Sequence, residues 1–437
     1  MSAEVLVIGG GPAGISAALE LARAGLRVTL CEQGPRLGGA IHRQPDDPAR
    51  PLRVPRAQKR RWHSLSAELA ASNIEILCRH IFAGIEGSGA VLLEDRVNAR
   101  LVTRRPAALV LALGAVERVT PIPGWQLPGV ITAGGLQMML KATGAAPAGD
   151  ILLAGSGPLL VAVAAQLAAL GKPPIAVLER STSPVSLPVI ANLLRAPAYL
   201  WEAAGYLLTL ARSGLRPRHA IIRAIAPTAE GRLSVTIATH AGLQQTLVVD
   251  RVALHDGLLP NGNGTASTPN GPFTVRAGDC REILGGVAAI ADGRLAARAV
   301  LAHLGQAAPA DNAPATILAR ERQAQSALNT LYDYAGTDPA QLPDDTVICR
   351  CEGRTLGQLR ALLASGDPVS AREIKLNGRF GMGACQGRFC AEFVTSFVAS
   401  QRGGEAPHVS EIVGTRWPVK PVPIAAFVTL PPSSPPE

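Results

Sequence analysis

Aromatic and charged residues are both scarce in this chain of 437 residues, at 3% and 17%. With so few rings, stacking platforms for single-stranded nucleic acids are not expected. The net charge is +9, and the densest basic run is "RPLRVPRAQKRRWH" (residues 50–63), but no nucleic-acid motif accompanies it. We therefore expect no nucleic-acid partner. We interpret the run as a solvated loop and helix start, or as a contact for a partner or a phosphate.

Long uninterrupted hydrophobic runs and a secretion signal are also missing. The most apolar long window, residues 186–214, is interrupted by Arg195 and Glu202 and contains Pro188 and Pro197. We expect packed core or interface helices here rather than a membrane span, with contact to a membrane surface as the alternative. The first residues lead into an apolar strand without a basic region or cleavage site, which predicts a cytoplasmic protein with reduced cysteines. Membrane association is then expected only at the periphery, through a complex.

A strand, a tight turn, a helix and a second strand are predicted over "EVLVIGGGPAGISAALELARAGLRVTLCEQ" (residues 4–33). The turn has the pattern G-x-G-x-x-G: Gly9 permits the turn, Gly11 lets backbone approach a pyrophosphate, and Gly14 allows the helix to pack closely on the strand. Glu32 follows Gly14 by 18 residues, where a carboxylate accepts hydrogen bonds from an adenosine ribose. The stretch therefore predicts a dinucleotide site.

Three further stretches resemble the flavoproteins with two dinucleotide-binding domains. The first is the glycine pair in "QGPRLGGAI". The second is "ALVLALGAVER", which is similar to their A-T-G segment and has Leu113 in the middle position. The third is "TVRAGDC", which is similar to their late G-D segment. In that group Asp279 would hydrogen-bond the ribityl chain, so the resemblance implies FAD. The residues expected to bind it are Gly9, Gly11, Pro12, Ala13, Gly14, Glu32, Gln33, Gly38, Gly39, Gly114, Gly278 and Asp279.

The same pattern recurs in "DILLAGSGPLLVAVAAQLAALGKPPIAVLERS" (residues 150–181). Gly155, Gly157 and Glu179 take the places of the first two glycines and the acid, but Leu160 replaces the third glycine, and we expect it to displace the helix or force local repacking. Glu179 would repel a 2′-phosphate, so NADP is disfavoured. Three alternatives remain for this fold: an NAD(H) substrate site, a bound adenine nucleotide (ATP, ADP or NAD) without hydride chemistry, or an empty fold.

A close redox cysteine pair, which disulfide reductases of this superfamily need, is missing. Cys31, Cys78 and Cys280 are isolated in the sequence, and we interpret each as a buried small apolar residue.

Four other cysteines form the pattern Cys-x-Cys, 33 intervening residues, then Cys-x-x-x-x-Cys: Cys349, Cys351, Cys385 and Cys390. Structural zinc sites usually use Cys-x-x-Cys knuckles, for which Cys-x-Cys is an awkward replacement. Four thiolates suit a [2Fe–2S] cluster, in which each iron takes two. The spacing favours the cluster and leaves zinc, or no metal, as alternatives.

The sequence around these cysteines resembles a known fusion. "CRCEGRT", "GRFGMGACQGRFC" and "RWPVKPVPI" are similar to the [2Fe–2S] domain related to bacterioferritin-associated ferredoxin, as fused to the flavoprotein A (α) subunit of opine oxidases, hydroxyproline dehydrogenases and hydrogen cyanide synthase. "PIPGWQLPGVITAGGLQ" (residues 121–137) also fits, so the resemblance covers about residues 3–426. It implies an α/β fold with two Rossmann-like domains, FAD, and a small α-rich C-terminal [2Fe–2S] domain.

Domain boundaries follow from these motifs. We expect a discontinuous FAD-binding domain at residues 1–145 and 246–330, a second nucleotide-binding domain at 146–245, a cluster domain at 331–426 and a Pro-rich tail at 427–437. One departure from the family is "NGNGTASTPNGP" (residues 261–272), a turn-rich loop where a longer stretch with extra strands is expected. It puts the edge of the FAD domain in doubt.

The resemblance implies an electron-transferring subunit of a hetero-oligomeric dehydrogenase for C–N bonds of an opine, hydroxyproline, proline or glycine. Substrate oxidation would lie on a partner β subunit of the amine-oxidase flavoprotein type, with a small third subunit in some systems and a quinone or another electron acceptor. The alternatives are a self-sufficient NADH-dependent flavin and iron–sulfur reductase, and a non-catalytic scaffold with a zinc-held tail.

Overall fold

The computed structural model describes residues 4–50, 52, 54–183, 186–194, 196–239, 242–262, 270–333, 339–364, 370–402, 407–414 and 417–428. Arg195, most of the predicted loop at 261–272 and all but the first two residues of the predicted tail lie outside these ranges.

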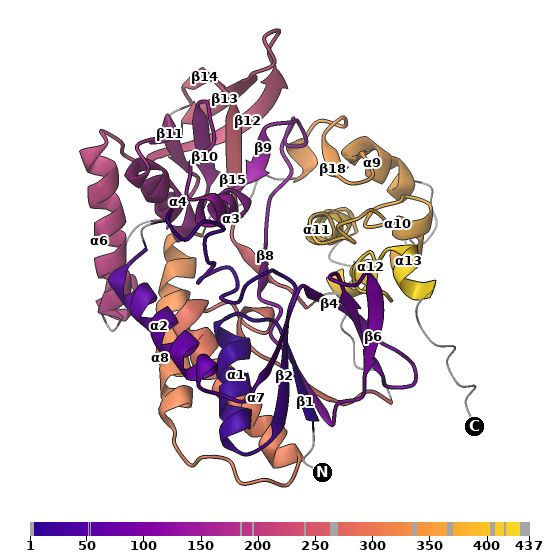
Figure 1. The fold of residues 1–437 in the computed structure, drawn as a ribbon. Coiled ribbons are helices and arrows are strands. Elements are labelled where there is room, and N and C mark those ends of the chain that lie inside the picture. The colour runs from indigo at the N-terminus through magenta and orange to yellow at the C-terminus, as the bar shows by residue number, and fades with distance from the viewer. Residues whose placement is uncertain are drawn as a thin grey trace.

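The first nucleotide fold is built on five parallel strands in the order β17-β7-β1-β2-β3. The strands are β1 (Glu4–Ile8), β2 (Arg27–Glu32), β3 (Glu75–Cys78), β7 (Ala108–Leu111) and β17 (Phe273–Arg276). The helices of this part are α1 (Pro12–Arg23), α2 (Arg56–Ala70), α7 (Gly285–His303) and α8 (Ala313–Leu331). Its last strand and last two helices thus come from far along the chain (Figure 1).

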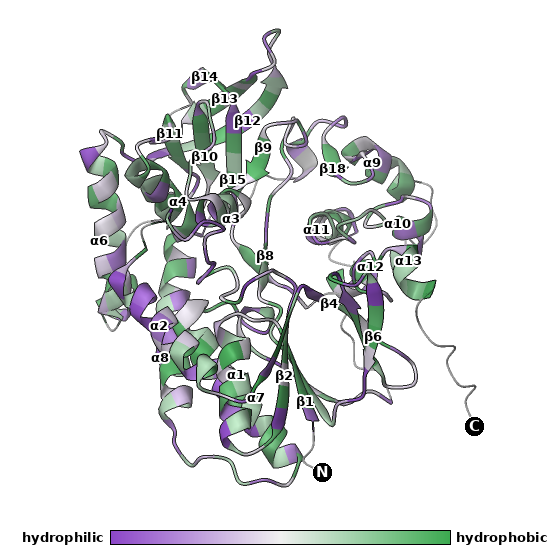
Figure 2. Cartoon of the chain, viewed as in Figure 1, coloured by the Kyte–Doolittle hydropathy of each residue, from purple (hydrophilic) through white to green (hydrophobic). Residues whose placement is uncertain are grey.

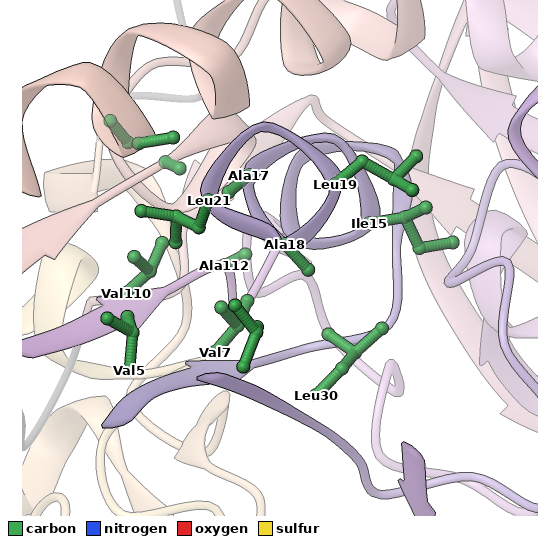
Figure 3. Packing of buried hydrophobic residues seen from close by; sticks show 14 of the residues in the cluster. Val5, Val7, Ile15, Ala17, Ala18, Leu19, Leu21, Leu30, Val110 and Ala112 are labelled. Carbon is green, nitrogen blue, oxygen red and sulfur yellow. The ribbon is translucent and has the colours of Figure 1, made fainter. Parts of the chain in front are cut away.

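Helix α1 covers this sheet because its apolar residues recur at helical spacing. Val5 and Val7 of β1 and Val110 of β7 lie in one buried cluster with Ala18 and Leu21 of α1 (Figure 3). All five side chains are buried, as the continuous apolar strands predict for a parallel sheet covered on both faces. The cluster fixes the N-terminal end of α1 beside the tight turn that precedes it.

The second nucleotide fold is a sheet of seven strands in the order β14-β13-β12-β11-β10-β15-β9. They are β9 (Val130–Thr132), β10 (Ile151–Gly155), β11 (Ala176–Glu179), β12 (Arg218–Pro227), β13 (Leu233–Thr239), β14 (Gln244–Val249) and β15 (Arg251–His255). Its helices are α3 (Ala133–Thr143), α4 (Pro158–Ala169), α5 (Leu187–Leu194) and α6 (Pro197–Arg212). Figure 2 shows the hydrophobic residues of β10 and its neighbours at the centre of this part.

The second sheet extends beyond the residues 146–245 expected for the second domain. Strand β15 pairs with β10 and with β9, and α3 contributes Leu136 and Leu140 to the core under that sheet. The expected boundaries therefore differ from the sheet membership at both ends, because short buried strands such as β9 and β15 carry no sequence signal for the sheet they join.

Two smaller sheets are formed by segments that precede the C-terminal part in the chain. One is antiparallel, with β4 (His80–Ile85), β5 (Val91–Asp95) and β6 (Arg100–Arg104). The other pairs β8 (Ala115–Glu117) with β16 (Leu258–Pro260), which links the strand end at Gly114 to the return of the chain after β15.

The C-terminal part has its own core. Its elements are the 3₁₀ turn η2 (Pro339–Gln341), strands β18 (Val347–Cys349) and β19 (Arg354–Thr355), and helices α9 (Leu356–Ala364), α10 (Ala371–Leu376), α11 (Ala391–Gln401), α12 (Val409–Val413) and α13 (Ile424–Val428). Phe380 and Phe397 are fully buried in it. Trp125 donates from Nε1 to the Val347 carbonyl (2.5 Å), and Phe389 packs on the core of the second sheet, so this part is docked on the nucleotide folds.

The most apolar window of the sequence forms α5 and α6. Leu187, Leu194 and Trp201 on these helices are exposed, at 82%, 63% and 79%. In the ranges that the structure describes, no helix is both long enough and apolar enough to cross a membrane.

Candidate cofactor sites

The tight turn after β1 has the close contacts that only glycine permits. Gly9 has φ +110°, and a Cβ there would lie 2.2 Å from the Ala112 carbonyl oxygen. A Cβ on Gly14 would lie 1.8 Å from the Gly9 carbonyl oxygen, which is far inside van der Waals contact. Gly11 is different: with φ −82°, its missing Cβ would meet only Gly39 Cα, at 3.8 Å. Gly9 and Gly14 therefore shape the turn, whereas Gly11 leaves room beside the helix N-terminus.

Glu32 stands at the end of β2 with its carboxylate turned back to the turn. Its two oxygens accept from the Gly10 amide (2.8 Å) and the Gly34 amide (2.6 Å), and the residue is 8% exposed. Each carboxylate oxygen keeps a lone pair for another donor, so a ribose hydroxyl can be bound at the same place. Beside it, Gln33 accepts through Oε1 from the ammonium group of Lys420 (2.5 Å).

The glycine pair after Glu32 brings a second loop against the turn. Gly38 donates its amide to the Gly10 carbonyl (2.8 Å), and a Cβ on Gly39 would lie 2.9 Å from Gly11 Cα. The loop is held from α3 by Lys141, whose Nζ donates to the carbonyls of Ala40 (2.9 Å) and Ile41 (3.2 Å). Burial lowers the pKa of Lys141 from 10.5 to about 8.

Asp279 and Gly278 begin the turn before α7. Asp279 accepts from the amides of Leu284 and Gly285, each at 3.2 Å, and burial raises its pKa. Gly278 has φ +71° and donates its amide to Asp292 Oδ2 (2.7 Å). Gly114, at the end of β7, has φ +69° with nothing within 4 Å of its missing side chain.

A cavity of about 2640 Å³ connects most of the predicted cofactor residues. It is lined by Gly9, Gly11, Pro12, Ala13, Glu32, Gln33, Gly39, Gly114, Asp279 and Gly157. The described lining does not include Gly14, Gly38, Gly278, Gly155 or Glu179. For the first three the reason is close packing: a Cβ on Gly14 or Gly38 would meet backbone oxygens, and one on Gly278 would lie 2.7 Å from Ala13 Cβ. The glycine turn, Glu32 and the turn before α7 thus share one cavity, as an extended dinucleotide would require.

An ionisable pair that the sequence did not reveal lies in the same cavity. Glu117, at the end of β8, accepts from the Gly134 amide (2.8 Å) at the start of α3. Its Oε1 also lies 2.8 Å from Nδ1 of His255, and both side chains are more than nine-tenths buried. Like Lys141 and Lys420, these residues come from elements distant in sequence, and no motif marks them.

The second nucleotide fold repeats the turn with a different helix contact. Gly155 has φ +142°, and a Cβ there would lie 1.6 Å from the His255 carbonyl oxygen. Leu160, in the place of the third glycine, is fully buried and packs with Leu153 and Val163 beneath α4. The larger side chain is therefore accommodated in the core of this fold. Glu179 is 9% exposed, and burial raises its pKa.

The four C-terminal cysteines meet as two cross-motif pairs. Cys390 acts on the pKa of Cys349, and Cys385 acts on that of Cys351, so thiols of the two motifs lie near each other. Cys390, with backbone amides nearby, lowers the pKa of Cys349 to about 6, and Cys349 in turn raises the pKa of Cys390. Across the described ranges, no three His, Cys, Asp or Glu side chains are placed as ligands of a single metal ion.

This two-plus-two arrangement suits a group with two metal centres, because each iron of a [2Fe–2S] cluster takes two thiolates. Gly383 approaches Cys351 so closely that a Cβ on it would lie 2.2 Å from that of the cysteine. The thiols and the tight glycine loop therefore fit such a cluster. The isolated cysteines differ: Cys31 and Cys280 are buried, and burial raises the pKa of Cys31 to about 12.

Comparison with known proteins first defines the class. Residues 3–194 match the pyridine nucleotide-disulphide oxidoreductase family. The fold is similar to that of L-proline dehydrogenase from P. horikoshii, with a TM-score of 0.67, 20% identity, and coverage of 98% of this chain and 79% of that one. Together they define an α/β fold with Rossmann-type nucleotide folds of the FAD- and NAD-binding type.

Two curated relatives narrow this. The A subunit of opine oxidase from Agrobacterium tumefaciens (strain Ach5) is 34% identical over 98% of this chain and 92% of its own length. The HcnB subunit of hydrogen cyanide synthase from Pseudomonas aeruginosa is 30% identical over 98% and 99%. The chain belongs to the family of opine oxidase A subunits and is an FAD-dependent oxidoreductase subunit.

Proposed function

We propose that this chain is the electron-transferring flavin and iron–sulfur subunit of a hetero-oligomeric FAD-dependent dehydrogenase acting on C–N bonds. The substrate class is an opine, hydroxyproline, proline or glycine. One observation carries the proposal: the cavity lined by Gly114 and Asp279 is also lined by Ala384 and Arg388, which flank Cys385. A flavin in the first fold would therefore lie in a cavity that extends to the loop carrying Cys385.

FAD is the proposed cofactor of the first fold. The free amides at the start of α1 would bind its pyrophosphate, Glu32 its adenosine ribose and Asp279 its ribityl chain. When bound, the flavin supplies two-electron chemistry. The chain's own part is to orient it and to hold the glycine-pair loop against Gly11, which Lys141 does from α3.

A [2Fe–2S] cluster is the proposed second cofactor, with Cys349, Cys351, Cys385 and Cys390 as ligands. When bound, it supplies one-electron transfer. The cross-motif pairs support two ligands per iron. A zinc-held tail on a non-catalytic scaffold is the alternative that metal analysis excludes or establishes.

Substrate oxidation is proposed to lie on a partner β subunit of the amine-oxidase flavoprotein type, with a small third subunit in some systems. Electrons would then leave the complex towards a quinone or another acceptor. Two observations support this: the curated relatives are both named as subunits, and the resemblance extends across almost the whole chain.

The test begins with the full chain purified anaerobically on its own. We expect a flavin spectrum, iron and acid-labile sulfide in a ratio of one, and no dye reduction with opines, proline, hydroxyproline or glycine. Co-expression with the proposed β subunit should restore substrate-dependent dye reduction. Dye reduction by the isolated chain on one of these substrates would contradict the division of labour.

A pair of cysteine variants tests the cluster. Cys385→Ser should abolish bound iron and sulfide while leaving flavin content unchanged. Cys78→Ser, at an isolated and partly buried position, should leave both unchanged. Zinc instead of iron in the wild type, or equal iron in both variants, would refute the assignment.

A self-sufficient NADH-dependent reductase is the alternative, since the second fold keeps Gly155, Gly157 and Glu179. Anaerobic addition of NADH distinguishes the two functions. Rapid bleaching of the flavin would favour the reductase; an unchanged flavin spectrum favours the electron-transferring subunit.

A further inference from the structure

The two nucleotide folds present the same acid in the same way. In the first, Glu32 accepts from the turn and from Gly34, two residues further on. In the second, Glu179 accepts from the Gly157 amide (3.4 Å) and from the Ser181 amide (3.0 Å), again two residues further on. By this geometry both carboxylates could bind an adenosine ribose.

Glu32 and Glu179 differ in whether they line the cavity. Glu32 faces the cavity, whereas Glu179 is absent from the described residues that line it. The segment Leu331–Asp333, which we call the strap, lies at this corner as the chain leaves α8. Helix α8 extends from the first nucleotide fold towards the second (Figure 1). Ser181 joins the strap to the acid, because its amide donates to Glu179 while its Oγ lies 2.9 Å from the Leu331 carbonyl oxygen and 2.7 Å from that of Asp333.

Three serines of the second fold hold the strap by its backbone. Ser156, between the two glycines of the turn, donates to the Tyr332 carbonyl (2.9 Å). Ser181 Oγ lies 2.9 Å from the Leu331 carbonyl oxygen and 2.7 Å from that of Asp333, so its single proton is shared between them. Ser183 also donates to the Asp333 carbonyl (2.8 Å). Three consecutive carbonyls are thus bound by the two loops that flank a ribose site.

The first fold has no means of making these contacts. Gly10 stands where the second fold has Ser156, and Gly34 stands where it has Ser181. Neither glycine has a hydroxyl, so the corner at Glu32 stays open to the cavity. The two folds therefore differ at the positions that bind the strap while keeping the acid and the amide two residues after it; the donor from the turn moves from Gly10 to Gly157, one position further on.

In the second fold, a histidine also restricts the place where a pyrophosphate would bind. Gly155 packs against the His255 carbonyl as Gly9 packs against that of Ala112, so His255 replaces a small residue at this place. Its Cδ2 and Nε2 lie 3.4 Å from where a Cβ on Gly157 would be. The ring therefore borders the glycine that a pyrophosphate would approach.

We propose that the strap is the built-in occupant of the second nucleotide fold: it closes the ribose corner at Glu179 to NAD(H) and other adenine nucleotides. The fold serves instead as the anchor for the chain between α8 and the cysteine-bearing part. This inference is independent of the function proposed above, because it concerns the second fold whether or not the cysteines hold a cluster.

The first test measures nucleotide binding to the full-length, FAD-saturated protein by calorimetry, with ADP-ribose as the probe. We expect no binding by the wild type at about 1 mM. The double variant Ser156→Gly/Ser181→Gly removes two of the three hydroxyl donors that bind the strap. Because one typical bond shifts an equilibrium about fivefold, we expect the variant to bind at least about tenfold more tightly. Ser213→Gly, at an exposed helix end, is the matched control and should behave as the wild type.

The second test measures how strongly the strap shields the ribose corner at Glu179 from a reagent in solution, and it does not depend on nucleotide binding. In Ser181→Cys, maleimide labelling mapped by peptide mass spectrometry should be at least about tenfold slower than in Ser213→Cys. Equal labelling rates would overturn the proposal. So would ADP-ribose binding by the wild type that Glu179→Ala abolishes, or a double variant that gains no binding.

Discussion

Gly11 and Gly14 are three residues apart in one motif, yet the structure gives them separable roles. A Cβ on Gly14 would lie 1.8 Å from the Gly9 carbonyl oxygen, so Gly14→Ala requires α1 to move away from the turn by about 1.6 Å to reach ordinary contact. Overpacking of this kind typically costs about 1–3 kcal/mol, and the movement would also disturb the buried cluster under α1. Gly14→Ala should therefore lower the free energy of unfolding even without flavin.

Gly11→Ala should act on the cofactor alone. Its backbone is at φ −82°, which alanine adopts freely, and the nearest atom to the added Cβ is Gly39 Cα at 3.8 Å. The stability of the apoprotein should stay within about 0.5 kcal/mol of the wild type. The added methyl group lies on the cavity side, where the pyrophosphate approaches, so flavin affinity should fall more than about tenfold, or about 1.4 kcal/mol.

Two assays separate these outcomes: urea titration of the apoproteins followed by circular dichroism, and flavin titration followed by fluorescence quenching. Gly25→Ala controls for replacing a glycine in this region, because nothing lies within 4 Å of its missing side chain and its φ of +84° predicts only local strain. Full flavin affinity in Gly11→Ala would refute the placement of the pyrophosphate. An unchanged apoprotein stability in Gly14→Ala would refute the close contact between turn and helix.

Two further predictions concern buried polar contacts. Between pH 8 and 10.5 Lys141 is protonated in the unfolded chain and neutral in the folded chain. The free energy of unfolding of the wild type should therefore rise with pH relative to that of Lys141→Met, by up to about 3 kcal/mol. Parallel pH curves of the two proteins in urea titrations would contradict this. Trp125→Phe leaves the Val347 carbonyl without its indole donor and should destabilise docking of the C-terminal part by about 1–3 kcal/mol in limited proteolysis. Its control, Arg118→Ala, breaks an exposed pair with Glu392 and should cost less than about 1 kcal/mol, so equal effects would show that the indole bond is not the anchor.

The sequence predicts the elements around each glycine motif because local rules govern them. The turn, helix and strand over residues 4–33 follow from Gly9, Gly14 and Glu32 together with apolar periodicity, and the structure has these elements at those residues. The class of flavin-dependent oxidoreductase subunit is likewise confirmed by the relatives.

What the sequence could not predict depends on contacts between distant segments. Lys141 and the Glu117–His255 pair come from elements brought together only by packing of the two nucleotide folds. The cysteines are close in sequence within each motif, yet the pKa of Cys349 depends on Cys390 and that of Cys351 on Cys385, because the fold of the intervening segment brings the two motifs together. The sequence also does not distinguish the serines that bind the strap from other loop serines, because their carbonyl partners lie far away in the chain.

The position of β17 and α7 in the first fold has a consequence for synthesis of the protein. Strand β17 pairs with β7, and Glu20 on α1 forms an ion pair with Arg298 on α7, 278 residues later. At about 5–20 residues per second, a ribosome needs roughly 15–55 s to make that distance. During this time the N-terminal strands lack their edge partner and the covering helix, so the nascent chain exposes an unpaired strand edge and apolar surface. Weaker induction of expression, or co-expression with chaperones, should therefore raise the yield of soluble protein.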